Sequence, residues 1–271
     1  MKITGNLRKM SSRLDDVVHY QWTTADVLEP MDPFELNPFV GKEVRLSFLN
    51  EIHCIATGKK IKKTFGEGLS YDAWLTSPAA TPSILRPELS RIHEGIALRD
   101  FDWEQKNHNQ PHFVYLTRTS DIKVGVTRSS NVPYRWIDQG ASEGILIAQT
   151  PYRQLAGLIE VAMKDHFSDK THWQNMLKNV FTNLQPMIDA KEDALGLLPE
   201  EYQEFIFDDD AITKIEYPVL RYPVKVRSIK LDKEPEIVST LVGIKGQYLI
   251  FENGAVLNVR SHAGYRVCLE V

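Results

Sequence analysis

Residues that could act on a phosphate ester lie close together in the middle of the chain. Tyr115 carries a phenol, Arg135 a guanidinium and Glu160 a carboxylate. Between Tyr115 and Arg135, the run KVGVT at residues 123–127 places Gly125 in a strand-like segment. A planar guanidinium pairs well with phosphate oxygens, and one carboxylate can hold a Mg²⁺ ion that keeps most of its waters. These residue types predict metal-assisted cleavage of a phosphate ester.

Two alternating segments predict the hairpin that would position Tyr115. Residues 112–118 and 121–127 both alternate, and the Thr119-Ser120 connection between them is short. Because strand side chains point to opposite faces in turn, a hairpin closed here places Tyr115 opposite Gly125. A glycine at that point leaves a shallow depression where a backbone phosphate could approach the phenol. The alternative is an aromatic ring that covers a glycine only for packing.

A further strand and a helix would carry the carboxylate. Residues 144–149, GILIAQ, have the pattern of a buried strand, and a short helix can precede them at 131–139. Thr150 and Pro151 then predict a helix start, with a threonine N-cap and a proline at the first helical position. The apolar face of this helix recurs at helical spacing, at Leu155, Leu158, Ile159, Ala162, Met163 and Phe167.

Glu160 lies on the flank of this helix rather than in its apolar face. As a functional residue it would hold Mg²⁺. Its alternative role is an ion pair with Lys164, one turn further on, which would stabilise the helix by only about 0.2–0.5 kcal/mol. Arg135 would bind a phosphate, or it could be an ordinary surface arginine. The sequence around Glu160 or Arg135 alone does not distinguish the functional role from the alternative one.

The chain divides into four regions by composition and pattern. Residues 1–75 are strand-rich, 76–111 are punctuated by prolines and predict an irregular linker, 112–210 form an α/β unit with a helical extension, and 211–271 return to strands. Asn253-Gly254 predicts a type I′ hairpin in the last region. Since chain ends often lie close together, these strands could complete the N-terminal ones. We expect an α+β fold, with a central β-β-α-β-α unit between two β-rich regions.

Composition and charge narrow the classes of protein. With 42% hydrophobic and 25% charged residues, the 271-residue chain has the composition of an ordinary globular protein. No apolar run approaches the roughly 20 residues of a membrane span, and the start of the chain lacks the apolar core of a secretory signal. We therefore expect a cytoplasmic protein without a membrane segment. Nothing in the sequence indicates an oligomeric state.

The segment 114–164 resembles the GIY-YIG nuclease domain, a three-stranded sheet with flanking helices. VYL at 114–116 stands at the first motif and KVG at 123–125 at the second, where Lys123 and Val124 replace a tyrosine and an isoleucine. Some branches of the superfamily have KIG followed by a threonine at this point. The resemblance implies a catalytic site, with Mg²⁺ on the glutamate, formed by Tyr115, Lys123, Gly125, Arg135 and Glu160.

Nucleic acid is the partner that this chemistry implies. The formal net charge of −4 does not indicate such a partner, although a local basic surface would suffice. Beside the predicted site, the expected contacts to nucleic acid are Thr127, Arg128 and Lys164. More distant candidates are the basic residues Arg8, Lys9, Lys59, Lys60, Lys62 and Lys63 and the aromatic residues Trp74 and Trp136, which we expect to be exposed.

Over nearly its whole length the chain is also similar to a bacterial family of unknown function, domain-of-unknown-function family 2797. The matching stretches are GNLRKM, KVGVTR, RWIDQGA, IEVAMKDHFSDKTHW, EYPV and LVGIKGQYLIFENGAVLNVRSHAGY. Relatives in this family carry a cysteine-rich zinc element before the nuclease-like unit.

The corresponding segment here keeps a single cysteine. Cys54 stands where a Cys-x-x-Cys pair would begin, with Thr57 as its partner, and Ser70 and Ala73 occupy the second pair. Tetrahedral zinc needs about four thiolate or imidazole ligands, so we expect a degenerate element without structural zinc. Cys268, the other cysteine, lies near the opposite end of the chain, and a disulfide framework is therefore not expected.

Three classes of function remain open on the sequence. The first is a Mg²⁺-dependent nuclease that hydrolyses phosphodiester bonds. The second is a module with the same scaffold that binds DNA or RNA without cleaving it. The third is a protein-interaction scaffold led by the C-terminal β region, which the negative net charge favours. No residue distinguishes DNA from RNA as the substrate.

Overall fold

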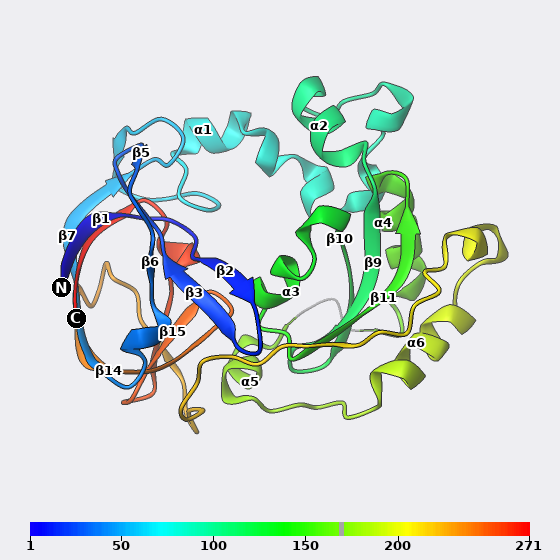
Figure 1. Cartoon of the computed structure of the whole chain (residues 1–271). Helices are drawn as coiled ribbons and strands as arrows, with labels where there is room; N and C mark the ends of the chain where they lie inside the picture. Colours follow the sequence, from blue (N-terminus) through cyan, green and yellow to red (C-terminus); the bar gives the residue numbers. More distant parts are fainter. Residues whose placement is uncertain (168–170) are drawn as a thin grey trace. The chain divides into compact units, whose positions relative to one another are not determined.

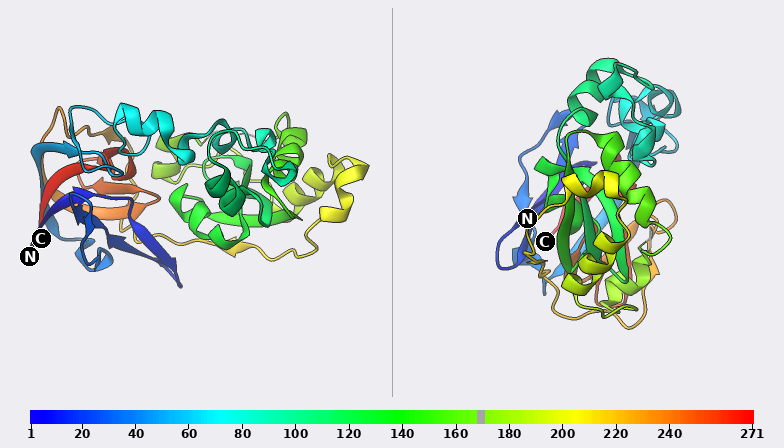
Figure 2. Two further views of the ribbon diagram at one scale, coloured as in Figure 1. Left: turned by 90° about the horizontal axis from the view of Figure 1, so that it is seen from above. Right: turned by 90° about the vertical axis from the view of Figure 1, so that its right-hand side faces the viewer.

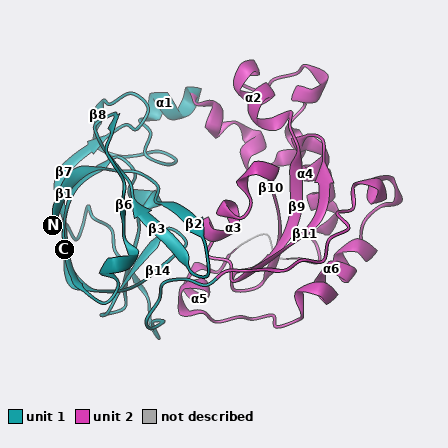
Figure 3. Ribbon diagram, in the orientation of Figure 1, with its two compact units in different colours: residues 1–76, 216–271 teal, residues 77–215 magenta. Residues whose placement is uncertain are grey.

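The computed structural model describes residues 1–167 and 171–271, which form two compact units (Figure 3). Unit 1 combines Met1–Thr76 with Glu216–Val271, and unit 2 consists of Ser77–Ile215. Residues 168–170, which belong to the stretch IEVAMKDHFSDKTHW, lie outside the described residues. Within the described part of the chain, no helix is long and apolar enough to cross a bilayer. The structure is mixed α+β, as the sequence predicts.

Unit 1 is built mainly of a ten-stranded sheet with the order β13-β16-β15-β14-β7-β17-β1-β4-β5, in which β8 also pairs with β7. A three-stranded sheet has the order β2-β3-β6. The strands are β1 (Lys2–Leu7), β2 (Ser11–Leu14), β3 (Val18–Trp22), β4 (Thr24–Asp26), β5 (Glu29–Pro30), β6 (Phe34–Glu35), β7 (Glu43–His53), β8 (Lys60–Ile61), β13 (Arg227–Ser228), β14 (Glu236–Lys245), β15 (Tyr248–Phe251), β16 (Ala255–Asn258) and β17 (Tyr265–Glu270). The helical elements are η1 (Asn37–Phe39), α1 (Tyr71–Thr76) and η8 (Arg260–His262).

The large sheet joins the two ends of the chain. β1 pairs antiparallel with β17, and β7 lies between β14 and β17. The N- and C-termini accordingly lie side by side (Figures 1 and 2). The regions 1–75 and 211–271, which the sequence presents as separate, therefore build one sheet together. In β7 the alternation of Val44 and Leu46, both buried, with exposed Glu43 and Arg45 is the pattern that predicted a strand.

Unit 2 contains a four-stranded antiparallel sheet with the order β10-β9-β11-β12 (Figure 1). Its strands are β9 (His112–Arg118), β10 (Ile122–Arg128), β11 (Glu143–Thr150) and β12 (Thr213–Lys214). Its α-helices are α2 (Phe101–His108), α3 (Tyr134–Asp138), α4 (Arg153–Met163), α5 (Trp173–Lys178) and α6 (Met187–Gly196). Its 3-10 helices are η2 (Pro78–Ala80), η3 (Pro82–Ile84), η4 (Pro87–Leu89), η5 (Ile92–Glu94), η6 (Ser129–Asn131) and η7 (Glu200–Phe205).

Helices α4 and α6 both pack on one face of this sheet. The shared core contains Val114, Leu116, Ile122, Val124, Ile145, Ile147, Ala148, Ala156, Ile159, Met163, Met187, Ala190 and Ala194. Helix α4 contributes Ala156, Ile159 and Met163, whose spacing puts them on one side of a helix. The opposite face of the sheet carries Tyr115 and receives α3.

β9 and β10 form the hairpin in the predicted register. Tyr115 lies opposite Gly125, and Thr117 lies opposite Lys123. A β-carbon added to Gly125 would lie 2.7 Å from Tyr115 Oη and 2.8 Å from its Cζ. The ring therefore covers the glycine closely, and only a residue without a side chain fits beneath it.

Two local predictions from the sequence are wrong. Helix α4 begins at Arg153 with Tyr152 as its N-cap, not at Thr150-Pro151. Thr150 instead ends β11, where it pairs with His112, and its hydroxyl donates to the Tyr152 carbonyl oxygen at 3.0 Å. In the β15–β16 turn Gly254 has a φ of 78° whereas Asn253 keeps a negative φ. A type I′ turn requires positive φ at both residues, so the connection is a different turn.

The segment 77–111, expected as an irregular linker, belongs to unit 2. It contains four 3-10 helices and α2, and η4 packs against α4. Gly157 makes this contact possible, because a side chain there would collide with the backbone of Pro87 and Glu88. The segment therefore lies against the helix that carries Glu160.

Candidate active site

The Tyr115 phenol lies between the sheet and α3. Its ring is 5.6 Å from that of Trp136, and its hydroxyl donates to Gln139 Oε1 at 3.4 Å. Burial raises the pKa of Tyr115, the charge and hydrogen bonding of the Arg135 guanidinium act to lower it, and the charge of Glu160 raises it. The structure thus brings three sequence-predicted residues together: Tyr115, Arg135 and Glu160. An ordinary tyrosine titrates near pH 10, so this phenol is protonated at neutral pH.

Helix α3 presents Arg135 and Gln139 on one side, because residues four apart in a helix lie above one another. Trp136 points toward the sheet, where Gly144 leaves room: a β-carbon on Gly144 would lie 2.5 Å from Trp136 Cε3. The Trp136 ring is 1% exposed and anchors the helix. The expectation of an exposed aromatic at this position is therefore wrong, since the missing side chain at Gly144 creates a buried seat for it.

Glu160 projects from α4 with a side chain that is 13% exposed. One of its carboxylate oxygens lies 3.8 Å from Lys164 Nζ, so the ion pair considered from the sequence is present. The carboxylate nevertheless acts on more than Lys164, since its charge raises the pKa of Tyr115 on β9 and of Arg153 at the start of α4. Glu160 therefore faces a polar cluster rather than only its helical neighbour.

Arg153, the first residue of α4, also belongs to this cluster. Its Nε donates to the Ser83 carbonyl oxygen at 3.0 Å and its Nη2 to the Ile84 carbonyl oxygen at 3.1 Å. Burial lowers the pKa of Arg153 to about 10, the charge of Glu160 opposes this, and the charges of Arg135 and other arginines add to it. The guanidinium remains positively charged at neutral pH.

His112 and Arg128 lie at the strand ends beside Arg153, and His108 is the last residue of α2. Arg128 is paired with His112 in the β9–β10 ladder, and its Nη1 donates to Asn107 Oδ1 at 2.7 Å. Burial lowers the pKa of His112 to about 4 and that of His108 to about 3, with the charges of Arg153 and Arg128 acting in the same direction. Both imidazoles are neutral at neutral pH.

The remaining sequence-predicted residues are engaged elsewhere. The Lys123 side chain is buried, and its Nζ donates to Thr171 Oγ1 at 2.9 Å. Thr127 is also buried, and its Oγ1 accepts a hydrogen bond from Asn131 Nδ2 at 3.2 Å. Lys164 stays on the surface of α4 with Glu160. The partner of Lys164, Glu160, belongs with Tyr115, Arg135 and Arg153 to one cluster, which we call the tyrosine cluster.

The tyrosine cluster offers a single glutamate, flanked by arginines, to a metal ion. Such a site suits a Mg²⁺ ion that keeps several waters and shares a substrate phosphate, and it does not suit an all-protein cage. Among residues 1–167 and 171–271, no group of three or more His, Cys, Asp or Glu side chains could hold a metal ion. Glu160 therefore fits a hydrated ion bound together with substrate.

Cys54 in unit 1, the single cysteine of the predicted degenerate zinc element, has a hydrogen-bonded thiol. Burial acts to raise the pKa of Cys54, but hydrogen bonds from Thr57, the Ser70 backbone and the Ala56 backbone lower it to about 7 overall. Thr57 and Ser70 are two of the positions that correspond to zinc ligands in the resembled pattern. They lie together with Cys54, and they engage it as hydrogen-bond donors.

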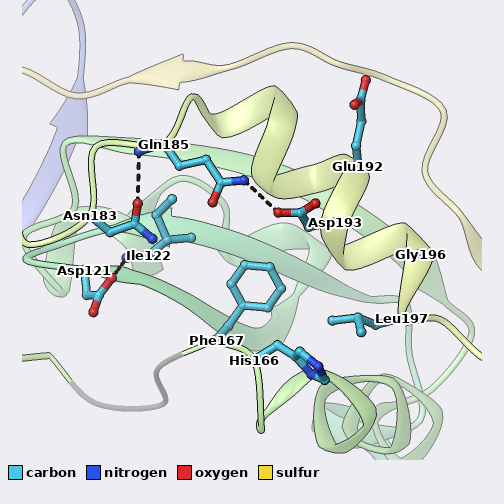
Figure 4. Close-up of a pocket in the computed structure, with 10 residues that line it drawn as sticks. All are labelled: Asp121, Ile122, His166, Phe167, Asn183, Gln185, Glu192, Asp193, Gly196 and Leu197. Carbon is cyan, nitrogen blue, oxygen red and sulfur yellow. Dashed lines mark hydrogen bonds between the residues drawn. The ribbon is translucent and has the colours of Figure 1, made fainter.

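A separate pocket of about 580 Å³ in unit 2 is shown in Figure 4. It is lined by Asp121, Ile122, His166, Phe167, Asn183, Gln185, Glu192, Asp193, Gly196 and Leu197. None of the sequence-predicted site residues lines it. The lining of this pocket includes residues of the β9–β10 hairpin and of α6. The tyrosine cluster, in contrast, is formed by β9, α3 and α4.

The sequence analysis missed Arg153, a member of the cluster, and Gln139, which accepts a hydrogen bond from Tyr115. Gln139 follows Arg135 by four residues, and Arg153 precedes Glu160 by seven, which is about two helical turns. Helix phase alone places each beside a residue already singled out. The helical spacing in the sequence could therefore have identified both residues. It could not have shown that Arg153 contacts η3, because η3 belongs to the segment predicted as a linker.

Comparison with known proteins gives one match. A family model described as "Protein of unknown function (DUF2797)" matches residues 41–267. A search of the curated proteins and a search of the solved structures return no match. The matched range begins in the loop before β7, includes all of unit 2 and ends within β17. The chain therefore belongs to this family of proteins of unknown function.

Proposed function

We propose that this protein hydrolyses phosphodiester bonds in nucleic acid with the help of Mg²⁺, using the tyrosine cluster. The observation that supports the proposal is the convergence of a phenol, a guanidinium and a carboxylate, Tyr115, Arg135 and Glu160, from three different elements. The resemblance of residues 114–164 to the GIY-YIG nuclease domain supports the same activity.

Each residue has a role that follows from its surroundings. The Arg135 guanidinium would hold the scissile phosphate through paired N–H donors. The phenol of Tyr115 donates to Gln139 and is hydrogen-bonded to Arg135, so one oxygen lone pair is left that would accept from a water molecule and orient it. Because burial raises its pKa, we assign Tyr115 to positioning this water rather than to deprotonating it. Gly125 leaves the room that the phenol occupies, since a β-carbon there would lie 2.7 Å from Tyr115 Oη.

Glu160 is the residue that would hold Mg²⁺. When bound, such an ion stabilises negative charge on the phosphate and the leaving oxygen. Lys164 neutralises part of the Glu160 charge at 3.8 Å, so it would have to swing away or share the carboxylate. The pair joins a Lys164 side chain that is 31% exposed to a Glu160 side chain that is 13% exposed, so a metal ion would have to compete with a partly buried ion pair.

Cleavage of a labelled panel of single- and double-stranded DNA and RNA in Mg²⁺ or Mn²⁺ tests the proposal. We expect the wild-type protein to cut at least one member and Glu160→Gln to lose at least about 100-fold of that rate, because the substitution removes the metal ligand. Glu192→Gln on the surface of α6 is the matched control and should keep full activity. Equal rates in wild type and Glu160→Gln would refute the site.

One observation favours a second candidate, binding without cleavage. Tyr115 is 1% exposed and Lys123 is occupied with Thr171, so both residues in the two motifs are withdrawn from solvent. A binding module would retain the arginines and dispense with the metal. It would show salt-sensitive affinity for nucleic acid, no cleavage with any metal, and unchanged affinity in Glu160→Gln.

A further inference from the structure

Arg153 has unused hydrogen-bonding capacity beside the tyrosine cluster. A guanidinium carries five N–H donors. Within the described part of the chain, two of the five are paired, through Nε with Ser83 and through Nη2 with Ile84. These two bonds fix the plane of the group against η3 and leave the Nη1 edge to face another acceptor.

A second arginine is held at the same end of the sheet. Arg128 ends β10, directly opposite His112, and Thr150 of β11 is paired with the other side of His112. Arg153 follows Thr150 by three residues at the start of α4. Asn107 orients Arg128 from α2. The ends of three adjacent strands therefore bring Arg128 and Arg153 to one side of the cluster, each braced by neutral oxygen acceptors.

Positive charge exceeds negative charge around these two residues. The charges of Arg128 and Arg135 both act on Arg153, and the carboxylates that act on it are Glu160 and Glu88. Glu88 already accepts a hydrogen bond from Arg86 at 3.0 Å. The neighbouring His108 and His112 carry no charge at neutral pH. Since the charges of Arg128 and Arg135 lower the pKa of Arg153, a phosphate bound beside these guanidinium groups would be stabilised electrostatically.

We propose that Arg128 and Arg153 form a second phosphate subsite, so that the strand is held by two phosphates on either side of Glu160. The inference rests on the proposed function and specifies its substrate: a nucleic-acid strand with consecutive phosphates, not a single phosphate ester. Arg135 takes the scissile phosphate, and the Arg128–Arg153 pair takes a phosphate further along the backbone. Arg153 is accordingly a positioning residue, since it acts on the substrate chain away from the reacting bond.

Salt dependence of oligonucleotide binding tests this subsite. Binding is measured in EDTA, which prevents metal-dependent cleavage, over a series of salt concentrations. For a single strand, log K falls with log salt by about 0.7 for each phosphate neutralised. We expect Arg153→Gln to weaken binding at least several-fold and to reduce the slope by about 0.7, and Arg128→Gln to do the same. Arg153→Lys, which keeps the charge, should keep most of the slope.

Arg91→Gln is the matched control, because Arg91 is exposed in unit 2 and paired with Glu94. It should leave both affinity and slope unchanged. If loss of the Ser83 and Ile84 bonds unfolds Arg153→Gln, the Arg128→Gln result decides, since that variant breaks no bond to the backbone. Slopes equal to wild type in Arg128→Gln and in folded Arg153→Gln would refute the subsite alone. Absence of any wild-type binding to nucleic acid would instead refute the proposed function.

Discussion

At the scale of single residues, the contact between Tyr115 and Gly125 determines the position of the phenol. A β-carbon at residue 125 would meet Tyr115 Oη at 2.7 Å and Cζ at 2.8 Å, which real β-carbons do not tolerate. The ring must therefore move if Gly125 gains a side chain. Since Arg135 and Gln139 both meet the phenol oxygen, such a movement would also disturb their arrangement.

We predict that Gly125→Ala destabilises the protein by about 1–3 kcal/mol, the usual cost of overpacking a buried site. Nuclease activity, where present, should fall with it because the phenol is displaced. The measurement is urea unfolding together with the cleavage assay. Gly196→Ala is the control, since nothing lies within 4 Å of a β-carbon there and the residue is helical. An alanine at 125 that changed neither quantity would show that the close contact is not maintained in solution.

At the scale of elements, α2 and β9 bring two buried histidines next to arginines. His112 donates from Nδ1 to the Gln110 carbonyl oxygen at 2.7 Å, and His108 shares a hydrogen bond with Ser90 Oγ at 3.2 Å. Their pKa values of about 4 and about 3 lie below the ordinary value near 6.5. Between these values the unfolded chain binds more protons than the folded chain, so stability must fall as the pH falls.

We therefore predict that the free energy of unfolding decreases by roughly 2 kcal/mol on account of His112 between about pH 7.5 and about pH 5. This contribution is fully present above about pH 6.5 and is lost as the pH approaches 4. His112→Gln should reduce the difference between the two urea unfolding curves, even if it lowers stability at both pH values. An unchanged pH dependence in that variant would show that His112 is not held neutral by the fold.

The elements themselves were predictable to different degrees. Strict alternation identified β9 and β10 and their register, and helical spacing identified the apolar face of α4. The predicted start of α4 was wrong, because Thr150 pairs with His112 in the sheet and does not serve as the N-cap of the helix. The sequence did not show that residues 77–111 pack against α4. Short proline-led turns have no local pattern that identifies a packing partner distant in the chain. Arg153 was missed for the same reason: its partners Ser83 and Ile84 are distant in sequence.

At the scale of the whole molecule, the chain builds unit 1 from both of its ends and unit 2 from its middle. Pairing between residues as far apart as Lys2 and Glu270 leaves no local sequence signal. The sequence therefore predicted two strand-rich end regions and the α+β class, and it only suggested that the ends could meet. β7 of the N-terminal region lies between β14 and β17 of the C-terminal region, so the two regions complete a single sheet.

Unit 2 has its own core, and we predict that residues 77–215 fold when produced alone. The fragment should unfold cooperatively in urea, because all of its core residues lie within it. A shorter fragment, 112–215, should be markedly less stable, since it lacks η4 against Gly157 and the carbonyl groups that hold Arg153. Equal stability of the two fragments would mean that residues 77–111 are dispensable for unit 2.

The position of β7 has a consequence for synthesis on the ribosome. β7 is translated early, and the short β8 that pairs with its end follows directly, but β14 and β17, which lie on its two sides, are translated after the whole of unit 2. The nascent chain therefore carries a long strand whose edges are largely open while unit 2 emerges and can fold. Open edges invite pairing with other chains, and the charged residues Glu43 and Arg45 on one face of β7 oppose it. Co-translational folding must thus run from the middle of this protein outward, with unit 1 closing last.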